Sequence, residues 1–334
     1  MLLPYNHPNV LLPTLVQITS PNGRAPSRTV LAISITLLMA IWAINFLVVK
    51  IGLHYLPALA FASFRVVAAG LFMIFLAPFC ARFPIFRDLS DSPLATRHSP
   101  RDFFAFFYLG FFGVSVNQLC FTLGLRYTNV THSAIIVGMA PIYTLTLAVL
   151  FRLEQPTLRK ALGMAIAFTG VAILASGTGM GHRSPTLLGD AITMCGSLGF
   201  AMYVVLGKRV AGKYNPLTMT TWNFLFGALL VLPVALQQTA AYELLHIWRT
   251  IPWQAYACVA YTAFFSSTLA YLFYFWLLRY LEASQLASFS YLLPVSASAL
   301  GIVFLGERGS WLELLGGALA LLGLYSIEST RRPA

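Results

Sequence analysis

Ten apolar runs, each about 20 residues long, occupy most of this chain of 334 residues. A helix needs roughly 20 mostly apolar residues to cross a bilayer, and in lipid it must satisfy its own backbone hydrogen bonds. The sequence therefore predicts an all-α, polytopic membrane protein with about ten transmembrane helices. The predicted spans are 30–49, 57–79, 103–123, 131–151, 158–176, 187–207, 216–237, 254–277, 284–305 and 311–328.

Charged residues make up only 9% of the chain, whereas about a quarter is usual in soluble domains. So few charges cannot cover a soluble surface, and the spans leave no room for a soluble domain. The net charge of +11 is compatible with nucleic-acid binding, but the basic residues lie in short connections between apolar runs. We therefore expect a lipid bilayer, and no nucleic acid, as the partner of these residues.

The basic residues are distributed unevenly between the two sides of the predicted membrane. If the connections and termini are assigned to alternate sides, one side holds fifteen Lys and Arg residues and the other holds five. The side richer in Lys and Arg is normally cytoplasmic. This distribution predicts that both termini are cytoplasmic, with residues 1–29 as an N-terminal tail rather than a signal peptide and residues 329–334 as a C-terminal tail.

The chain also contains an internal repeat, because the stretch 124–170 recurs at 277–323 with a constant shift of 153 residues. Pairs with this shift include Arg126/Arg279, Pro141/Pro294, Glu154/Glu307, Gly163/Gly316 and Gly170/Gly323. An earlier stretch recurs with a shift of 158 residues, which pairs Ala43 with Ala201 and Lys50 with Lys208.

The repeat predicts two five-span units, at residues 30–176 and 187–328. Since five is odd, the second unit enters the membrane from the opposite side, and the repeats are inverted. Inverted repeats are typical of secondary transporters, whose substrate site lies near the midplane between the halves.

Arg65 is the only charged residue well inside a predicted span. A central arginine costs about 2.5–3.5 kcal/mol on insertion scales, so such residues usually face a cavity or a partner. The alternative is that Arg65 extends to the interface or bonds the carbonyl groups of neighbouring helices. Its repeat counterpart is Asn223, which follows Trp222.

Asn117 and Gln118 are adjacent amides deep in the third span. Unsatisfied amides in lipid cost several kcal/mol. They point about 100° apart on a helix, so we expect one to face a cavity and the other to bond a neighbouring helix; both could instead only join helices. The candidate substrate-binding residues are Asn45, Arg65, Asn117, Gln118, Tyr203, Trp222, Asn223, Tyr271 and Tyr291, which include the counterparts Asn45/Tyr203 and Gln118/Tyr271.

Two prolines, Pro141 and Pro294, occupy matching positions within spans. A proline removes a backbone hydrogen bond and kinks a helix. One such kink is usually static, but its recurrence in both halves favours a paired gate.

We find no enzyme motif, no metal-ligand spacing and no cofactor motif. No Asp or Glu lies near the middle of a span, which argues against acid/base catalysis within the membrane. His132, near the start of the fourth span, is more typical of packing than of a proton site. We therefore expect no catalytic residues, no metal and no cofactor.

The residues that carry a family resemblance lie throughout 30–328. They are Trp42-Ala-Ile-Asn-Phe46 with Lys50, Pro57 to Arg65, Gly124-Leu-Arg-Tyr-Thr128, Ala134, Pro141-Ile142, Glu154, Gly163, Gly170, Gly189-Asp190, Pro294, Gly306-Glu307 and Gly316. In these positions the chain resembles the EamA type of the drug/metabolite transporter superfamily. The resemblance implies an inner-membrane carrier with inverted repeats and a central cavity. Similar members export amino acids, other small metabolites or drugs.

We therefore expect a secondary transporter that moves a small metabolite, such as an amino acid or a related amphipathic or aromatic compound, by alternating access. The absence of a carboxylate inside the spans favours facilitated diffusion or exchange over proton antiport. The alternatives are a lipid flippase or a membrane enzyme acting on an amphipathic substrate, and a channel, which the scarce polar residues disfavour. Either a monomer or a homodimer fits the sequence.

Overall fold

The computed structural model of the protein describes residues 26–80, 99–127, 130–177, 186–244, 250–296 and 310–328, and these contain helices and no strand. The first half comprises α1 (Arg28–Tyr55), α2 (Ala58–Cys80), α4 (Pro100–Leu109), η1 (Gly110–Val116), α5 (Asn117–Tyr127), α6 (Val130–Gly138), α7 (Ala140–Leu150) and α8 (Leu158–Gly177). The second half comprises α9 (Leu187–Val210), α10 (Pro216–Leu244), α11 (Trp253–Tyr261), η3 (Thr262–Leu269), α12 (Ala270–Tyr280), α13 (Ala283–Ser288), η4 (Phe289–Tyr291) and α15 (Trp311–Glu328). Of these, η1 and η3 are π-helical and η4 is a 3₁₀ turn.

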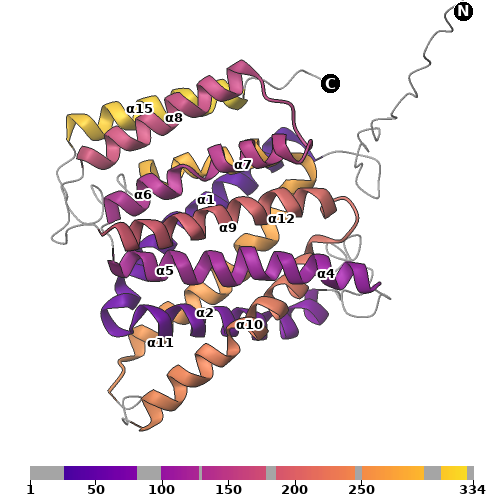
Figure 1. Cartoon of the computed structure of the whole chain (residues 1–334), viewed down its shortest axis with the longest axis vertical. Coiled ribbons are helices and arrows are strands. Elements are labelled where there is room, and N and C mark those ends of the chain that lie inside the picture. The colour runs from indigo at the N-terminus through magenta and orange to yellow at the C-terminus, as the bar shows by residue number, and fades with distance from the viewer. Residues whose placement is uncertain are drawn as a thin grey trace, which may run out of the picture.

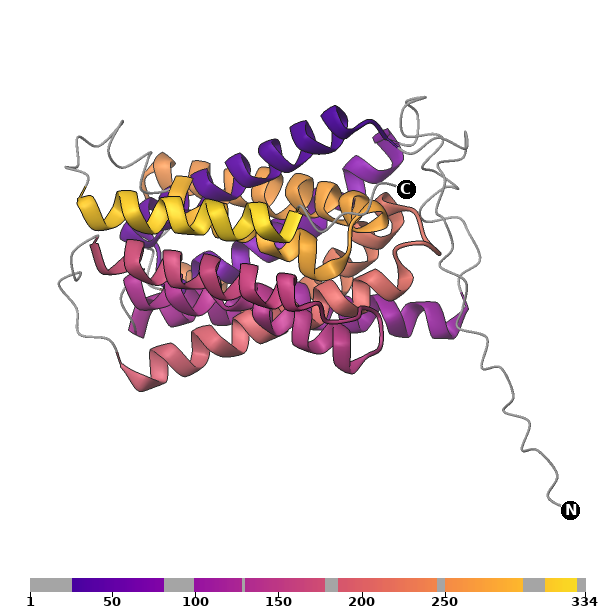
Figure 2. The ribbon, with the colours of Figure 1, turned by 90° about the horizontal axis from the view of Figure 1, so that it is seen from above.

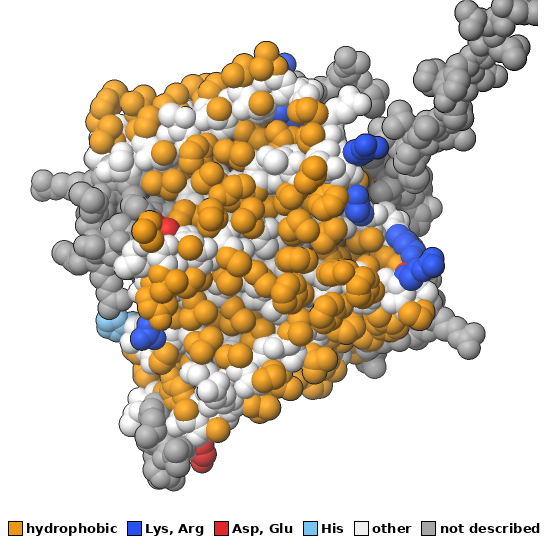
Figure 3. Space-filling view, in the orientation of Figure 1, with side chains coloured by type: hydrophobic (Ala, Val, Ile, Leu, Met, Phe, Trp, Pro, Cys, Tyr) orange, Lys and Arg blue, Asp and Glu red, His pale blue; other side chains and the backbone are white. Residues whose placement is uncertain are grey.

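The helices are long and apolar enough for a polytopic membrane protein, which confirms the predicted fold class. Among the described residues, six stretches have the length and hydropathy to cross a membrane: Arg28–Tyr55, Ala58–Phe79, Pro100–Tyr127, Leu187–Val210, Pro216–Glu243 and Trp253–Tyr280. Two shorter apolar stretches are Ile135–Leu150 and Trp311–Ile327. The face seen in Figure 3 is mostly apolar, and its blue Lys and Arg side chains gather mainly along one edge.

Contacts between connections show that the third span runs opposite to the fourth and sixth spans. At one end, Arg209 Nη2, which lies near the end of the sixth span, donates to the carbonyl of Phe151 after the fourth span, at 3.3 Å. At the same end of the sixth span, Lys213 forms an ion pair of 2.7 Å with Asp102 at the start of the third. At the other end, Thr186 Oγ1 donates to the carbonyl of Tyr127 at 2.6 Å.

The last helix of each half shows how the repeats are related, because α8 and α15 lie side by side (Figures 1 and 2). A Cβ atom built at Gly170 would lie 2.6 Å from the carbonyl oxygen of Gly316, and one built at Gly163 would lie 3.0 Å from that of Gly323. Gly316 is the repeat counterpart of Gly163. Gly323 is the counterpart of Gly170. Each glycine thus meets the counterpart of the other on an antiparallel helix, as a two-fold axis in the membrane plane requires.

A second pair of counterpart helices, α2 and α10, packs at the same axis. A Cβ atom built at Gly70 would lie 2.6 Å from the Cβ of Ala228, which is its own counterpart at the shift of 158 residues. Small residues at these crossings let the backbones approach closely, which is how helices associate in lipid. The two halves therefore share one helical core rather than forming separate bodies.

Candidate functional site

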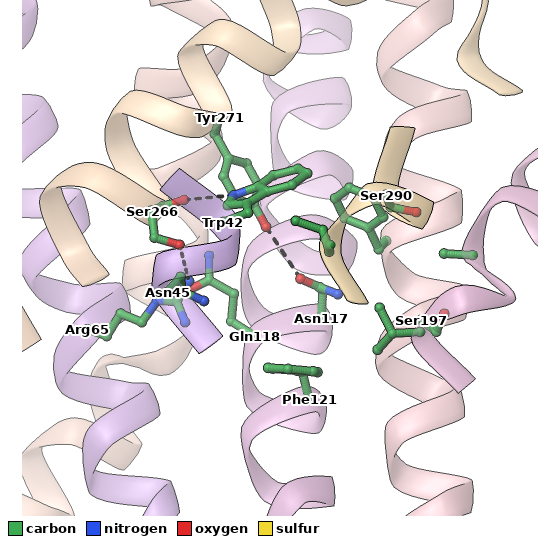
Figure 4. A pocket seen from close by; sticks show the side chains of 14 residues that line it. Trp42, Asn45, Arg65, Asn117, Gln118, Phe121, Ser197, Ser266, Tyr271 and Ser290 are labelled. Carbon is green, nitrogen blue, oxygen red and sulfur yellow. Dashed lines mark hydrogen bonds between the residues drawn. The ribbon is translucent and has the colours of Figure 1, made fainter. Parts of the chain in front are cut away.

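A cavity of about 110 Å³ lies between the two halves (Figure 4). Its lining comes from the first half through Trp42, Asn45, Arg65, Asn117, Gln118, Phe121, Val137 and Ala140, and from the second through Ser197, Phe200, Ser266, Tyr271, Ser290 and Leu293. Four repeat pairs are among them, namely Trp42/Phe200, Gln118/Tyr271, Val137/Ser290 and Ala140/Leu293. The cavity therefore lies on the pseudo-two-fold axis, where inverted-repeat carriers place their substrate site.

Arg65, on α2, places its guanidinium at the cavity and is only 5% exposed. Its Nε donates to Ser267 Oγ at 2.9 Å and its Nη2 donates to Ser266 Oγ at 3.3 Å. Both serines belong to η3 in the other half. The arginine is thus held by neutral hydroxyl groups.

Asn117, at the start of α5, links the third span to two spans of the other half. Its Nδ2 donates to the carbonyl of Gly196 on α9 at 3.0 Å, and its Oδ1 accepts from the Tyr271 hydroxyl at 3.3 Å. Gln118 Oε1 accepts from Ser267 Oγ at 3.3 Å. Both amides line the cavity and both bond neighbouring helices, so the expected division of roles between them is not observed.

The π-helical segments η1 and η3 occupy matching positions in the two halves, because the shift of 153 residues carries 110–116 to 263–269. A π-helix takes its carbonyl groups out of the α-helical register, and such segments are frequent at functional sites. Here the Gly113 carbonyl accepts from the Tyr271 hydroxyl at 3.1 Å, and the Ser266 carbonyl accepts from Trp42 Nε1 at 3.3 Å. The irregular backbone thus fixes two aromatic side chains at the cavity.

Aromatic rings form much of the remaining wall. The ring of Trp42 lies 5.9 Å from that of Phe200 and 6.2 Å from that of Tyr271, both in edge-on contact. Phe121 lies one helical turn beyond Asn117 on α5 and also lines the cavity. A few polar groups on an otherwise aromatic wall are typical of sites that bind small organic molecules.

Five of the nine predicted binding residues line this cavity: Asn45, Arg65, Asn117, Gln118 and Tyr271. The other four lie outside its lining. Tyr203 is fully buried behind Tyr271, with ring centroids 5.4 Å apart. Trp222 packs edge-on against Phe103 at 4.9 Å.

Asn223 and Tyr291 complete that group, and both contact other helices. Asn223 is fully buried where α10 crosses η1, so that a Cβ built at Gly110 would lie 2.6 Å from its carbonyl oxygen. The Tyr291 hydroxyl donates to the carbonyl of Met164 on α8 at 3.4 Å. In this conformation the Tyr291 side chain joins two helices, and Asn223 lies at a helix crossing.

Both predicted gate prolines follow an irregular stretch of helix. Met139 interrupts the fourth span between α6 and α7, two residues before Pro141. The 3₁₀ turn η4 precedes Pro294 in the ninth span. The residues just before the prolines, Ala140 and Leu293, line the cavity at matching positions.

Sequence reasoning missed Trp42, Phe121, Phe200 and the lining serines. Helical spacing could have found the aromatic residues, because side chains three or four positions apart share a face. Trp42 is three residues before Asn45, and Phe121 is three after Gln118. The serines carry no such signal, since a serine in a span commonly bonds its own helix.

The part of the chain that the structure describes contains no group of three or more His, Cys, Asp or Glu residues that could hold a metal ion. His132 lies at a position whose side chain is outside the described set.

Comparisons with known proteins agree with this architecture. The profile of the EamA-like transporter family matches residues 30–176 and again residues 187–328. A protein of Archaeoglobus fulgidus named "Uncharacterized transporter" is 26% identical over 90% of this chain and 98% of its own length. A "Probable terminal-alkyne amino-acid exporter" of Streptantibioticus cattleyicolor is 23% identical over 90% of this chain and 94% of its own.

Two further matches extend this comparison. A "Probable amino-acid metabolite efflux pump" of Salmonella typhimurium is 25% identical over 86% of this chain and 91% of its own length. A solved crystal structure superposes with a TM-score of 0.66 at 14% identity, covering 90% of this chain and 96% of the other. At that identity the superposition supports the fold alone.

Proposed function

Because the chain belongs to the EamA-like transporter family, and is therefore a multi-pass membrane transporter of small metabolites rather than an enzyme, we propose that it is a secondary carrier working by alternating access. Its cargo is an amino acid or a related amphipathic or aromatic compound, which it exports across the plasma membrane. The observation that carries this proposal is the cavity on the pseudo-two-fold axis, which both halves line with matched residues.

The names of two relatives support the substrate class, since one is a probable amino-acid exporter and the other a probable amino-acid metabolite efflux pump.

The predicted orientation places both termini, and the ends of the even-numbered spans, on the cytoplasmic side. The basic residues at that end of the molecule support this orientation. Exposed Arg101, Arg152 and Lys213 lie there, and basic residues favour the cytoplasmic side.

The flippase alternative requires Arg65 to face lipid headgroups through a lateral opening. Arg65 is instead 5% exposed and bonded to η3. The burial of this residue supports a carrier of soluble metabolites.

The described residues that line the cavity include no Asp or Glu, which supports exchange or facilitated diffusion. We expect an imposed pH gradient alone to drive little net transport in proteoliposomes, whereas substrate loaded on the far side accelerates uptake. If a pH gradient drives strong transport, and replacing one carboxylate abolishes it, the proposal of exchange or facilitated diffusion is contradicted.

Asn117→Ala is expected to lower the transport rate about threefold to tenfold, because it removes the bonds to Gly196 and Tyr271 at the cavity and each neutral hydrogen bond contributes about 0.5–1.5 kcal/mol. Transport is measured in proteoliposomes, and membrane insertion is measured by the amount of protein in the membrane fraction.

The matched control is Leu123→Ala, a truncation on the same helix at a half-buried position outside the cavity lining. It is expected to leave the transport rate within about twofold of the parent. Equal transport by Asn117→Ala and the parent would remove Asn117 from the site.

A further inference from the structure

The guanidinium of Arg65 is a buried cation with no counter-ion among the residues that the structure describes. Ion pairs in the described part of the chain include those of Lys160 with Glu154 and Glu282 and of Lys213 with Asp102, whereas the contacts of Arg65 are of another kind. None of the described residues that line the cavity carries a carboxylate, and the hydrogen-bond partners of Arg65 are the neutral hydroxyls of η3. Because an unpaired charge in a low-dielectric interior is costly, an anion that enters the cavity gains a strong interaction.

Three further polar atoms of cavity-lining residues lack partners within the described residues, namely Gln118 Nε2, Asn45 Oδ1 and Ser290 Oγ. Gln118 Nε2 is a buried donor without an acceptor, and Asn45 Oδ1 is a buried acceptor without a donor. Their residues are 3% and 7% exposed, respectively, and both line the same cavity as Arg65 (Figure 4). Native structures satisfy nearly all buried polar groups. The unpartnered donor of Gln118, the unpartnered acceptor of Asn45 and the guanidinium of Arg65 line the same cavity. This arrangement therefore indicates a ligand that binds all three groups.

We propose that Arg65 and Gln118 bind the carboxylate of a monoanionic substrate, and that Asn45 Oδ1 accepts a hydrogen bond from an ammonium or hydroxyl group of the same molecule. This inference rests on the proposed carrier function and names its substrate class. One guanidinium balances one negative charge, and its planar fork matches a carboxylate. The aromatic wall around Trp42 and Phe200 leaves the rest of the substrate an apolar environment.

We call Arg65 and Gln118 the carboxylate anchor. If they bind a carboxylate, acids should bind and their neutral derivatives should not. The probes are the common amino acids, each paired with its C-terminal amide, and 3-phenylpropionate. Binding is measured as thermal stabilisation of the purified full-length protein. We expect one or more acids to bind about 10- to 100-fold more tightly than the matching amide, as the loss of a charged hydrogen bond implies. Amides that bind as tightly as their acids, or no stabilisation by any acid, would overturn the proposal.

Substitutions of Arg65 show whether this residue binds the carboxylate or only stabilises the fold. Arg65→Gln is expected to abolish the discrimination between acid and amide, and Arg65→Lys to give an intermediate affinity because it retains the charge without the fork. Without ligand, Arg65→Gln should melt no lower than the parent, because it removes an unpaired buried charge. Arg126→Gln, an equal charge change at an exposed position outside the cavity, should leave affinity unchanged.

A second variant covers the case in which Arg65→Gln fails to fold. Gln118→Leu keeps the charge of Arg65 and removes the Nε2 donor, together with the acceptor of the Ser267 hydroxyl. It is expected to weaken acid binding about threefold to tenfold, with little effect on the amide. Equal weakening of acid and amide by Gln118→Leu would overturn the anchor.

Transport assays test the carboxylate anchor and the proposed carrier function separately. If the parent exchanges acids and amides equally in proteoliposomes and Arg65→Gln does the same, the anchor is wrong and the carrier stands. If acids stabilise the parent in an Arg65-dependent way but no bound compound crosses the membrane, the anchor stands and the carrier is wrong.

Discussion

Lys160→Met is expected to lower the free energy of unfolding by about 3 kcal/mol, because it leaves Glu154 as a buried anion without its counter-ion. The two side chains are 7% and 3% exposed, and Lys160 Nζ lies 3.0 Å from Glu154 Oε2. Breaking a buried pair costs about 3–5 kcal/mol, and the hydrogen bonds that Glu154 keeps place the effect at the lower end. Unfolding in detergent micelles, followed by intrinsic fluorescence, measures the change.

This ion pair has a large effect because it belongs to a network that joins the two halves. Glu154 Oε1 accepts from the backbone nitrogen of Ser284 at 3.0 Å, and Oε2 accepts from the Ser284 hydroxyl. Lys160 also pairs with Glu282, the residue before α13. Removing the lysine therefore weakens the connection between the fourth and fifth spans and the beginning of the ninth.

Lys213→Met is the matched control, since Lys213 pairs with Asp102 at 2.7 Å but is 62% exposed. The bond to Asp102 raises the pKa of Lys213, so the lysine stays charged at neutral pH. An exposed pair contributes about 0–1 kcal/mol. Adding Glu154→Gln to Lys160→Met should restore part of the lost stability. Equal losses in Lys160→Met and Lys213→Met would show that burial of the pair does not matter.

Much of the fold follows from features visible in the sequence. Apolar runs of bilayer length predict an all-α membrane protein, and that prediction is confirmed. Matched glycines at 163, 170, 316 and 323 indicate the repeat, and the structure shows them meeting across α8 and α15. The π-helical segments η1 and η3 were not predictable, because they depend on carbonyl partners from distant helices rather than on local apolar pattern.

The candidate site is less predictable because depth in a span does not reveal which face points inward. Asn45 and Tyr203 are repeat counterparts at matching depth, yet Asn45 lines the cavity and Tyr203 is buried behind it. Phe200, three residues before Tyr203, takes the place at the cavity. The direction each side chain faces is set by packing between halves, which a single sequence does not encode locally.

The contact between α8 and α15 allows a test in which two adjacent glycines respond oppositely. A Cβ atom built at Gly316 would lie 2.4 Å from the backbone nitrogen of Leu174 and 2.5 Å from the carbonyl oxygen of Gly170. Backbone atoms cannot move aside as a flexible side chain can. A Cβ atom built at Gly317 would meet nothing closer than Val295 Cγ1 at 3.7 Å, an ordinary contact distance.

Gly316→Ala is therefore expected to destabilise the protein by about 1–3 kcal/mol, because the helices must separate to admit the methyl group. Gly317→Ala should be neutral or stabilising by up to about 1 kcal/mol, since alanine favours the helix. Both substitutions lie in α15, so helix propensity contributes equally and the difference in unfolding free energy reports the contact alone. Gly163→Ala, at the counterpart of Gly316, should have a smaller effect, because its Cβ would lie 2.8 Å from the movable Ile327 Cγ1 and 3.0 Å from the Gly323 oxygen. Equal melting temperatures for Gly316→Ala and Gly317→Ala would mean that α8 and α15 do not pack through these glycines.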